Sequence, residues 1–345
     1  MFTHILFFLV GIGIVLGTLH SAIRSLVLPR ATPDPLTILE FSTFHFLFRL
    51  ITQRARSYTA RDRVMAYLAP VALLTLVPVW FILITLGYMC IYWALGTGTW
   101  YESFRLSRSS LLTLGFSTSE IPLVTVFSFS EATIGLMLVA LLIAYLPTIY
   151  AAFSRREVVV TMLEVRAGSP PSAVEMIPRF NRIHGFEQLT EQWQIWEKWF
   201  SDIQESHTSF AALVFLRSPD PEYSWLTASG TILDTASITL STIDIPNDPA
   251  AALCIRAGYL ALGHIADYYR IPFNTDPQYP IDKISVNREE YDEACNRLSN
   301  AGVSLKEDRE QAWRDFAGWR VNYDTVLLAL AKLTMAPDAT WTGDR

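Results

Sequence analysis

Lysine is absent from the first 154 residues, and acidic residues are scarce there. That region holds nine arginines and six acidic residues, for a net charge of +3, whereas residues 155–345 hold 18 basic and 27 acidic residues, for −9. Only 17% of the 345 residues are charged, against about 25% in typical soluble domains. We therefore expect a membrane-embedded half followed by an acidic soluble domain. No basic stripe occurs in the acidic half, which argues against nucleic-acid binding.

Cysteine is also scarce. The three that occur, Cys90, Cys254 and Cys295, show no metal-ligand spacing and leave an odd count. A disulfide framework is therefore not expected, and a reducing compartment fits the last two. The sequence also lacks a Gly-x-Ser-x-Gly elbow, a His-Glu-x-x-His pair, a dinucleotide-binding glycine motif and a Walker lysine motif. These absences argue against an enzyme, a bound cofactor and any resident metal.

Long apolar runs are what the first half has in abundance. Residues 5–28, 64–95 and 134–153 each reach or exceed the about 20 residues that cross a bilayer, and only Arg24 interrupts them. The alternative for the first run is a cleaved signal peptide, but residues 1–4 lack its basic segment. We therefore predict three retained membrane helices.

Two glycines mark the first of these runs. Gly13 and Gly17 stand four residues apart, and this spacing permits close contact with another helix. The alternative is that they are ordinary glycines of an apolar helix.

The arginines predict the topology. Residues 29–63 contain six of them, and such density marks a cytoplasmic loop. They are Arg30, Arg49, Arg54, Arg56, Arg61 and Arg63. Within this loop, residues 41–51 are aromatic and then basic, as in an interfacial helix on an anionic leaflet; an ordinary connector is the alternative. Arg155 and Arg156 return the chain to the cytoplasm, so we expect a multi-pass protein of the cell (inner) membrane with its N-terminus outside and its C-terminal domain cytoplasmic.

The segment between the second and third runs is too polar for a lipid-facing helix and too apolar for a solvated loop. A short helix that re-enters the membrane from outside, covered by protein, satisfies both constraints. We place this helix and a following loop at residues 100–118.

The loop carries the tetrapeptide Thr113-Leu114-Gly115-Phe116, midway between two charge-free runs. In this order of parts the sequence resembles the prokaryotic two-helix, pore-loop potassium channels, whose filter reads Thr-x-Gly-Tyr/Phe-Gly. The resemblance covers roughly residues 64–153. It implies an all-α, homotetrameric membrane channel with potassium as permeant ion. It also implies that the backbone carbonyls of these four residues replace the water shell of the ion, with the Thr113 hydroxyl at the inner mouth.

The sequence departs from the family pattern beside this tetrapeptide. Ser117, which the resemblance also places among the ion-binding filter residues, stands in place of the second glycine, where a left-handed backbone would cost about 1–2 kcal/mol. Thr118 replaces the usual aspartate, and Glu120 is the nearest candidate to restore negative potential at the outer mouth. These departures put strict potassium selectivity in doubt. A non-conducting or non-potassium-selective channel-like membrane sensor or scaffold is therefore the alternative function.

Charged and bending residues of the expected pore domain have two interpretations each. Arg105 and Arg108 on the pore helix either pack behind the filter or oppose cation entry, and Glu102 is placed to pair with Arg105. Gly135 is either a gating hinge or a site of close helix packing. Pro147 is a second candidate for a bend near the inner mouth.

The second half reads as a helical bundle of five or six helices. Apolar spacing predicts helices at 186–210, 250–269, 289–301 and 307–333, with a break at 168–172 and a proline-rich connection at 270–284. A bundle core is the expected place of three tryptophans, Trp193, Trp196 and Trp199. The separated histidines of this half are expected at surface or core positions; they are His184, His207 and His264.

The chain is thus expected to have four parts. These are an N-terminal transmembrane helix (1–28), a cytoplasmic interfacial segment (29–63), a pore domain (64–154) and a cytoplasmic helical domain (155–345). Its expected partners are copies of itself, the lipid bilayer, and an unknown cytoplasmic ligand or protein.

Overall fold

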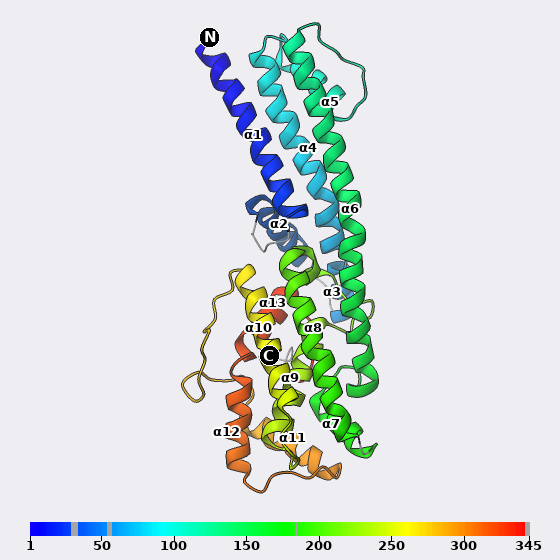
Figure 1. Cartoon of the computed structure of the whole chain (residues 1–345), viewed down its shortest axis with the longest axis vertical. Helices are drawn as coiled ribbons and strands as arrows, with labels where there is room; N and C mark the ends of the chain where they lie inside the picture. Colours follow the sequence, from blue (N-terminus) through cyan, green and yellow to red (C-terminus); the bar gives the residue numbers. More distant parts are fainter. Residues whose placement is uncertain (29–33, 54–56, 184, 342–345) are drawn as a thin grey trace. The chain divides into compact units, whose positions relative to one another are not determined.

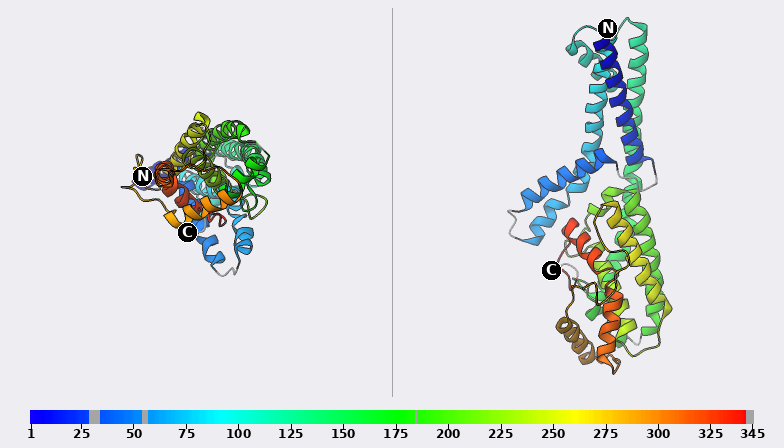
Figure 2. Two further views of the ribbon diagram at one scale, coloured as in Figure 1. Left: turned by 90° about the horizontal axis from the view of Figure 1, so that it is seen from below. Right: turned by 90° about the vertical axis from the view of Figure 1, so that its left-hand side faces the viewer.

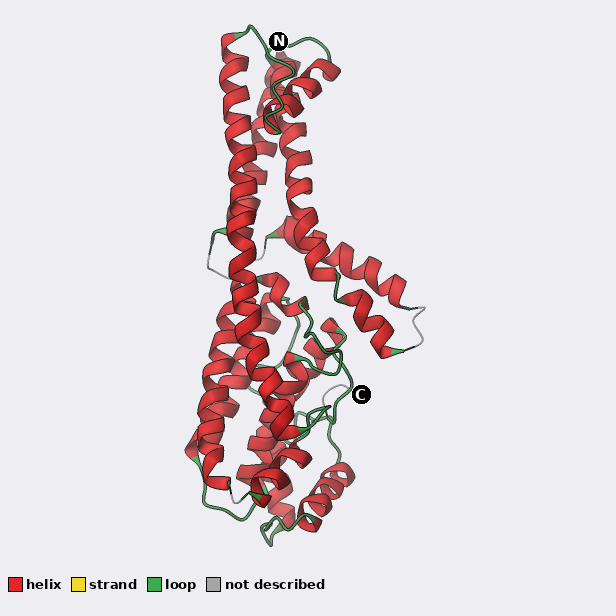
Figure 3. Cartoon of the chain, turned by 90° about the vertical axis from the view of Figure 1, so that its right-hand side faces the viewer, coloured by secondary structure: helices red, strands yellow, loops and turns green. Residues whose placement is uncertain are grey.

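The structure is a computed structural model that describes residues 1–28, 34–53, 57–183 and 185–341. These residues are helical with connecting loops and contain no strand, so the all-helical prediction is confirmed (Figure 1; Figure 3). Arg30, Arg54, Arg56 and His184 lie outside the described residues. The first seven elements are α1 (Phe2–Leu26), α2 (Pro35–Thr52), α3 (Tyr58–Met65), α4 (Leu68–Ala94), α5 (Trp100–Leu111), α6 (Pro122–Ala167) and α7 (Ala173–Arg182). Next come η1 (Phe186–Gln188), α8 (Leu189–Ser209), η2 (Ala211–Phe215), α9 (Trp225–Ser241), α10 (Pro249–Tyr268), α11 (Arg288–Asn300), α12 (Arg309–Arg320) and α13 (Asp324–Thr334).

The chain forms two compact units. The first unit comprises residues 1–54 and 66–151, and the second comprises residues 55–65 and 152–345. The division falls inside α6, and α3 belongs to the second unit.

Four helical segments among the described residues are long and apolar enough to cross a membrane. They are α1, the α3–α4 segment from Tyr58 to Ala94, α6 and α10. The first three correspond to the apolar runs of the sequence, which supports a membrane protein. The fourth, α10, packs against α8 and α9 of the second unit.

In the first unit, α1 packs along α4 (Figure 2). The close approach is made by Gly11 and Gly87, because a Cβ atom on Gly11 would lie 2.5 Å from the carbonyl oxygen of Gly87. A Cβ atom on Gly13 or Gly17 would have no neighbour within 4 Å. The glycine pair that the sequence analysis singled out therefore makes no close helix contact within the chain.

Helix α2 is tied to α1 and α4 by two buried carboxylates. Asp34 caps α2 by accepting from the Thr37 backbone N–H at 2.9 Å, and it accepts the Ser21 hydroxyl of α1 at 2.7 Å. Glu40 accepts the Thr75 hydroxyl of α4 at 2.8 Å. The predicted helix at 41–51 is therefore present within α2, and its position on a membrane surface stays a prediction.

The second unit is built around α9, of which all but one residue is buried. Helices α7, α10, α12 and α13 pack against α9, and α8 packs against α10. Trp193, Trp196 and Trp199 of α8 are buried, which confirms their predicted place in a core.

Most helices of this unit were predicted. The expected segments at 186–210, 250–269 and 289–301 correspond to α8, α10 and α11, and the proline-rich connection is a loop. The expected single helix at 307–333 is wrong: residues 321–323 divide it into α12 and α13. Helices α7 and α9 were not predicted.

The end of α6 was also predicted. The helix continues to Ala167 and stops at Gly168, which adopts a φ of +82°. Glycine takes this left-handed conformation without steric cost.

Candidate functional site: the loop between α5 and α6

Helix α5 begins at a capping box. The Thr99 side chain accepts the Glu102 backbone N–H at 3.2 Å, and the Glu102 carboxylate accepts the Thr99 backbone N–H at 2.6 Å. This reciprocal pair satisfies backbone donors that a helix start leaves free. Glu102 is used as a cap, and its carboxylate makes no ion pair with Arg105 among the described residues, although the charge of Arg105 still acts on it electrostatically.

The C-terminal end of α5 lies directly against α6. A Cβ atom on Gly135 would lie 2.3 Å from the carbonyl oxygen of Leu111, so only glycine fits there. Of the two interpretations of Gly135, the structure supports close packing. Helix α6 is continuous through Gly135 and Pro147, and a bend or gate at either residue stays a prediction.

A buried carboxylate connects three helices behind the loop. Glu131 of α6 has no exposed surface. One of its oxygens accepts the Ser107 hydroxyl of α5, and the other accepts the Tyr92 hydroxyl of α4 at 2.7 Å. This network fixes α5 between α4 and α6. The sequence analysis did not place Glu131 in the site, although an acidic residue inside an otherwise apolar helix is a recognisable signal.

The loop itself is closed by a serine pair. The Ser117 backbone N–H donates to the Ser109 hydroxyl oxygen at 2.9 Å, and that hydroxyl donates to the Ser117 carbonyl at 3.1 Å. The Leu114 backbone N–H donates to the Ser109 carbonyl at 2.9 Å. Ser109 thus holds the loop at two points: at Leu114 within the predicted filter and at Ser117 directly after it.

The backbone of the loop turns at Thr113 and Gly115, whose φ angles are 53° and 70°. The left-handed conformation expected at Gly115 is present. The expected left-handed conformation of Ser117 is wrong, because its φ is not positive. The second left-handed residue is Thr113, so the steric cost of about 1–2 kcal/mol falls at the start of the tetrapeptide.

Four consecutive carbonyl oxygens of this loop are free. No described residue donates a hydrogen bond to the carbonyls of Thr113, Leu114, Gly115 or Phe116. All four residues are exposed. Their carbonyl oxygens are therefore open to water, an ion or another molecule. The Thr113 hydroxyl donates to the Leu112 carbonyl at 2.8 Å, which leaves its own oxygen able to accept or to coordinate.

Two electrostatic features act on this loop in opposite directions. The loop follows the C-terminal end of α5, where the helix dipole favours a cation. Arg105 of α5 lies with its guanidinium carbon 5.9 Å from the centre of the Phe116 ring, and Arg108 lies 5.1 Å from the Phe104 ring. Both arginines are exposed.

Residues after the tetrapeptide are open to solvent. Thr118 and Glu120 are exposed, and Ser117 is half-buried. Among the described residues no three His, Cys, Asp or Glu side chains come together as a metal-ligand cluster.

Comparison of the chain with protein-family models, curated proteins and solved structures finds no match. The function must therefore be argued from the site itself.

Proposed function

We propose that the chain forms a homotetrameric membrane ion channel of the potassium-channel type, in which cations pass along the carbonyl oxygens of Thr113–Phe116. The observation that carries the proposal is the row of four free carbonyls. Such oxygens replace the hydration shell of an ion in a selectivity filter. The row coincides with the tetrapeptide that carries the family resemblance.

The surroundings of the loop support a cation in preference to an anion. The carbonyls present partial negative charge, and the C-terminal end of the α5 dipole adds to it. The Ser109 clamp and the Glu131 network hold the loop in one geometry. A rigid frame lowers the cost of placing carbonyl groups around a dehydrated ion.

The proposed assembly follows from the reach of one loop. A single loop presents ligands from one side, so several copies must surround an ion, and the family resemblance implies four. Leu114 and Phe116 are 56% and 53% exposed. Apolar side chains open at the edge of such a loop are suited to contact with neighbouring copies.

A second candidate function is a channel-like membrane sensor or scaffold that does not conduct or does not select potassium. The observation that favours it is the position of Arg105 over Phe116. Four such cations beside one filter would raise the energy of an entering cation. Thr118 offers no carboxylate to offset them.

Ion flux distinguishes the two candidates. The full chain, purified and reconstituted in liposomes, is expected to pass potassium along a gradient. Absence of flux for every monovalent cation would contradict conduction by the natural sequence. In that case the variant carrying Ser117→Gly and Thr118→Asp decides between them. Flux through that variant would identify a pore-loop scaffold with a silent filter, and its continued absence would refute the channel architecture.

A further inference from the structure

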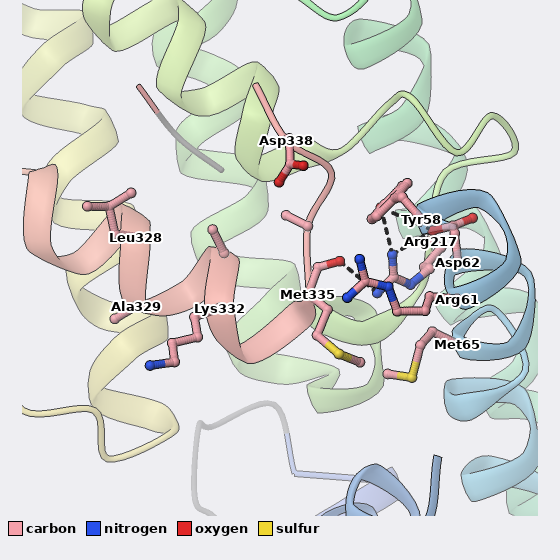
Figure 4. Close-up of a pocket in the computed structure, with 12 residues that line it drawn as sticks. Tyr58, Arg61, Asp62, Met65, Arg217, Leu328, Ala329, Lys332, Met335 and Asp338 are labelled. Carbon is pink, nitrogen blue, oxygen red and sulfur yellow. Dashed lines mark hydrogen bonds and ion pairs between the residues drawn. The ribbon is translucent and has the colours of Figure 1, made fainter. Parts of the chain in front are cut away.

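Arg217 of the second unit binds the carbonyl oxygens at the end of a helix. It lines a cavity of about 520 Å³ between α3 and the end of α13 (Figure 4). Its guanidinium donates to the carbonyls of Thr334 and Met335 and pairs with the carboxylate of Asp62. These carbonyls are therefore occupied, and the charge of Arg217 is neutralised inside the unit.

Arg105 of the first unit lies beside free carbonyls and binds none of them. Its guanidinium carbon is 5.9 Å from the centre of the ring of Phe116, the last residue of the tetrapeptide Thr113–Phe116. Arg105 is exposed and makes no hydrogen bond or ion pair with a described residue. The carbonyls of the tetrapeptide therefore stay available to an ion, and a positive charge without an ion-pair partner stands beside them.

No carboxylate of the described residues binds at this tetrapeptide. Glu102 accepts a backbone N–H at the start of α5 at 2.6 Å, and Glu131 accepts hydroxyls of α4 and α5. Glu120 follows the tetrapeptide, is exposed and makes no ion pair with a described residue. Proteins usually hold divalent cations with one or more carboxylates, which offset the double charge. The free carbonyls carry only partial charge, so they suit a singly charged ion better.

We propose that Arg105 excludes divalent cations from the tetrapeptide and so makes it selective for singly charged ions. This inference rests on the proposed function, in which the tetrapeptide binds the permeant cation. The repulsion between a guanidinium and a cation is proportional to the charge of the cation. Potassium therefore meets half the repulsion that a divalent ion meets at the same position, and in the proposed tetramer four copies of Arg105 act together.

Arg108 offers a matched comparison on the same helix. It is exposed, as Arg105 is, and its guanidinium carbon lies 5.1 Å from the ring of Phe104. Phe104 belongs to α5, whereas the ring that Arg105 contacts belongs to the tetrapeptide. The two arginines thus share charge and exposure and differ in the ring that each contacts.

Barium block of potassium flux tests the proposal on the full chain reconstituted in liposomes. Barium is the probe because its dehydrated ion is close to potassium in size, so the two ions differ mainly in charge. The barium concentration that halves the flux is expected to fall about fivefold or more in Arg105→Gln. It should change less than about twofold in Arg105→Lys, which keeps the charge, and in Arg108→Gln. Melting temperatures in detergent show that each variant is folded.

Ionic strength distinguishes an effect of charge from an altered loop. Salt screens charges on exposed side chains. The difference in barium block between the natural chain and Arg105→Gln should therefore shrink when choline chloride is added. A difference that does not change with salt would show that the substitution acts through the shape of the loop, and would overturn the proposal.

Three further results are decisive. Equal barium block in the natural chain and Arg105→Gln, or an equal shift in Arg108→Gln, would overturn the proposal. Potassium flux in Arg105→Gln but not in the natural chain would also overturn it, because Arg105 would then exclude singly charged ions as well. Absence of potassium flux in all of these proteins would instead contradict the proposed function, and the inference would fall with it.

Discussion

Ser109 and Ser117 form a two-way clamp across the loop that follows α5. The Ser109 hydroxyl accepts the backbone N–H of Ser117 and donates to its carbonyl. This pairing satisfies the backbone of Ser117 in a conformation with negative φ. Ser117, which the family resemblance sets against a second glycine, thus has no left-handed strain, because a side chain from the preceding helix holds it.

The clamp predicts that Ser109→Ala disorders the proposed filter at a moderate cost to the fold. The change removes two hydrogen bonds of about 0.5–1.5 kcal/mol each from a half-buried loop. Potassium flux in liposomes should lose discrimination against sodium, and the melting temperature should fall by less than it does in Glu131→Ala. The control is Thr133→Ala, which removes an exposed hydroxyl bonded to its own helix at Phe129. Unchanged selectivity in Ser109→Ala would show that the clamp does not hold the filter.

The Glu131 network predicts a larger effect on stability. Glu131→Ala removes the near acceptor of the Ser107 and Tyr92 hydroxyls and leaves them the longer contacts to the Thr85 carbonyl at 3.5 Å and the Ser128 hydroxyl at 3.4 Å, at a cost of up to about 1–3 kcal/mol each. Glu131→Gln keeps one carbonyl oxygen and should lose less. Thermal melting of the purified chain in detergent measures both. If Glu131→Ala melts at the same temperature as the natural chain, the hydrogen bonds of Glu131 do not stabilise the fold.

The contact between Gly135 and Leu111 predicts that Gly135→Ala is destabilising. The added methyl group would lie 2.3 Å from a backbone oxygen, so α5 and α6 must separate, at about 1–3 kcal/mol. Gly13→Ala is the matched control, because a Cβ atom there meets no neighbour within 4 Å and gains about 0.5–1 kcal/mol of helix preference. Melting in detergent should therefore fall for the first variant and not for the second. The reverse order would refute the packing role of Gly135.

The buried histidine of the second unit predicts a pH dependence. Burial, together with the Arg156 guanidinium, holds the pKa of His207 well below its ordinary value. Arg156 Nη1 lies 3.1 Å from His207 Nε2, and because a guanidinium only donates, Nε2 accepts and the ring is neutral.

The sign of the effect follows from this depressed pKa. Below about pH 6.5 the unfolded chain binds a proton at His207 that the folded chain does not bind. The free energy of unfolding should fall by up to about 1.4 kcal/mol per pH unit as pH decreases below 6.5, and this contribution should be absent above it. Denaturant unfolding between pH 5 and 8 measures the slope. His207→Gln should flatten it, whereas His264→Gln, at an exposed position, should not; equal slopes in the natural chain and His207→Gln would contradict the account.

Helices with one apolar face were predictable, and a helix buried on all sides was not. Helices α8 and α10 carry apolar residues at helical spacing because each has a solvent-facing side. Helix α9 reads Trp-Leu-Thr-Ala-Ser-Gly at its start and is rich in Ser and Thr throughout. These residues have modest helix preference, and full burial removes the alternation of polar and apolar faces. This segment is helical because it packs against other helices, and such packing cannot be predicted from the local sequence.

The position of the candidate site in the sequence was predictable, but the hydrogen bonds that hold its loop were not. The tetrapeptide and its place between two apolar helices are visible in the sequence, and so is Gly115 as a left-handed residue. The interactions of Ser109, Ser107 and Tyr92 depend on how α4, α5 and α6 approach one another. Glu102 was assigned to Arg105 because their spacing allows it, but the start of α5 offered backbone N–H donors that bind it in the capping box.

The most direct test of the account is an experimental structure of the full chain purified in lipid nanodiscs with potassium present. The account predicts four copies around one axis, with the carbonyl oxygens of Thr113, Leu114, Gly115 and Phe116 facing that axis and ion density between them. A single copy, or an assembly in which this loop faces away from a shared axis, would contradict it.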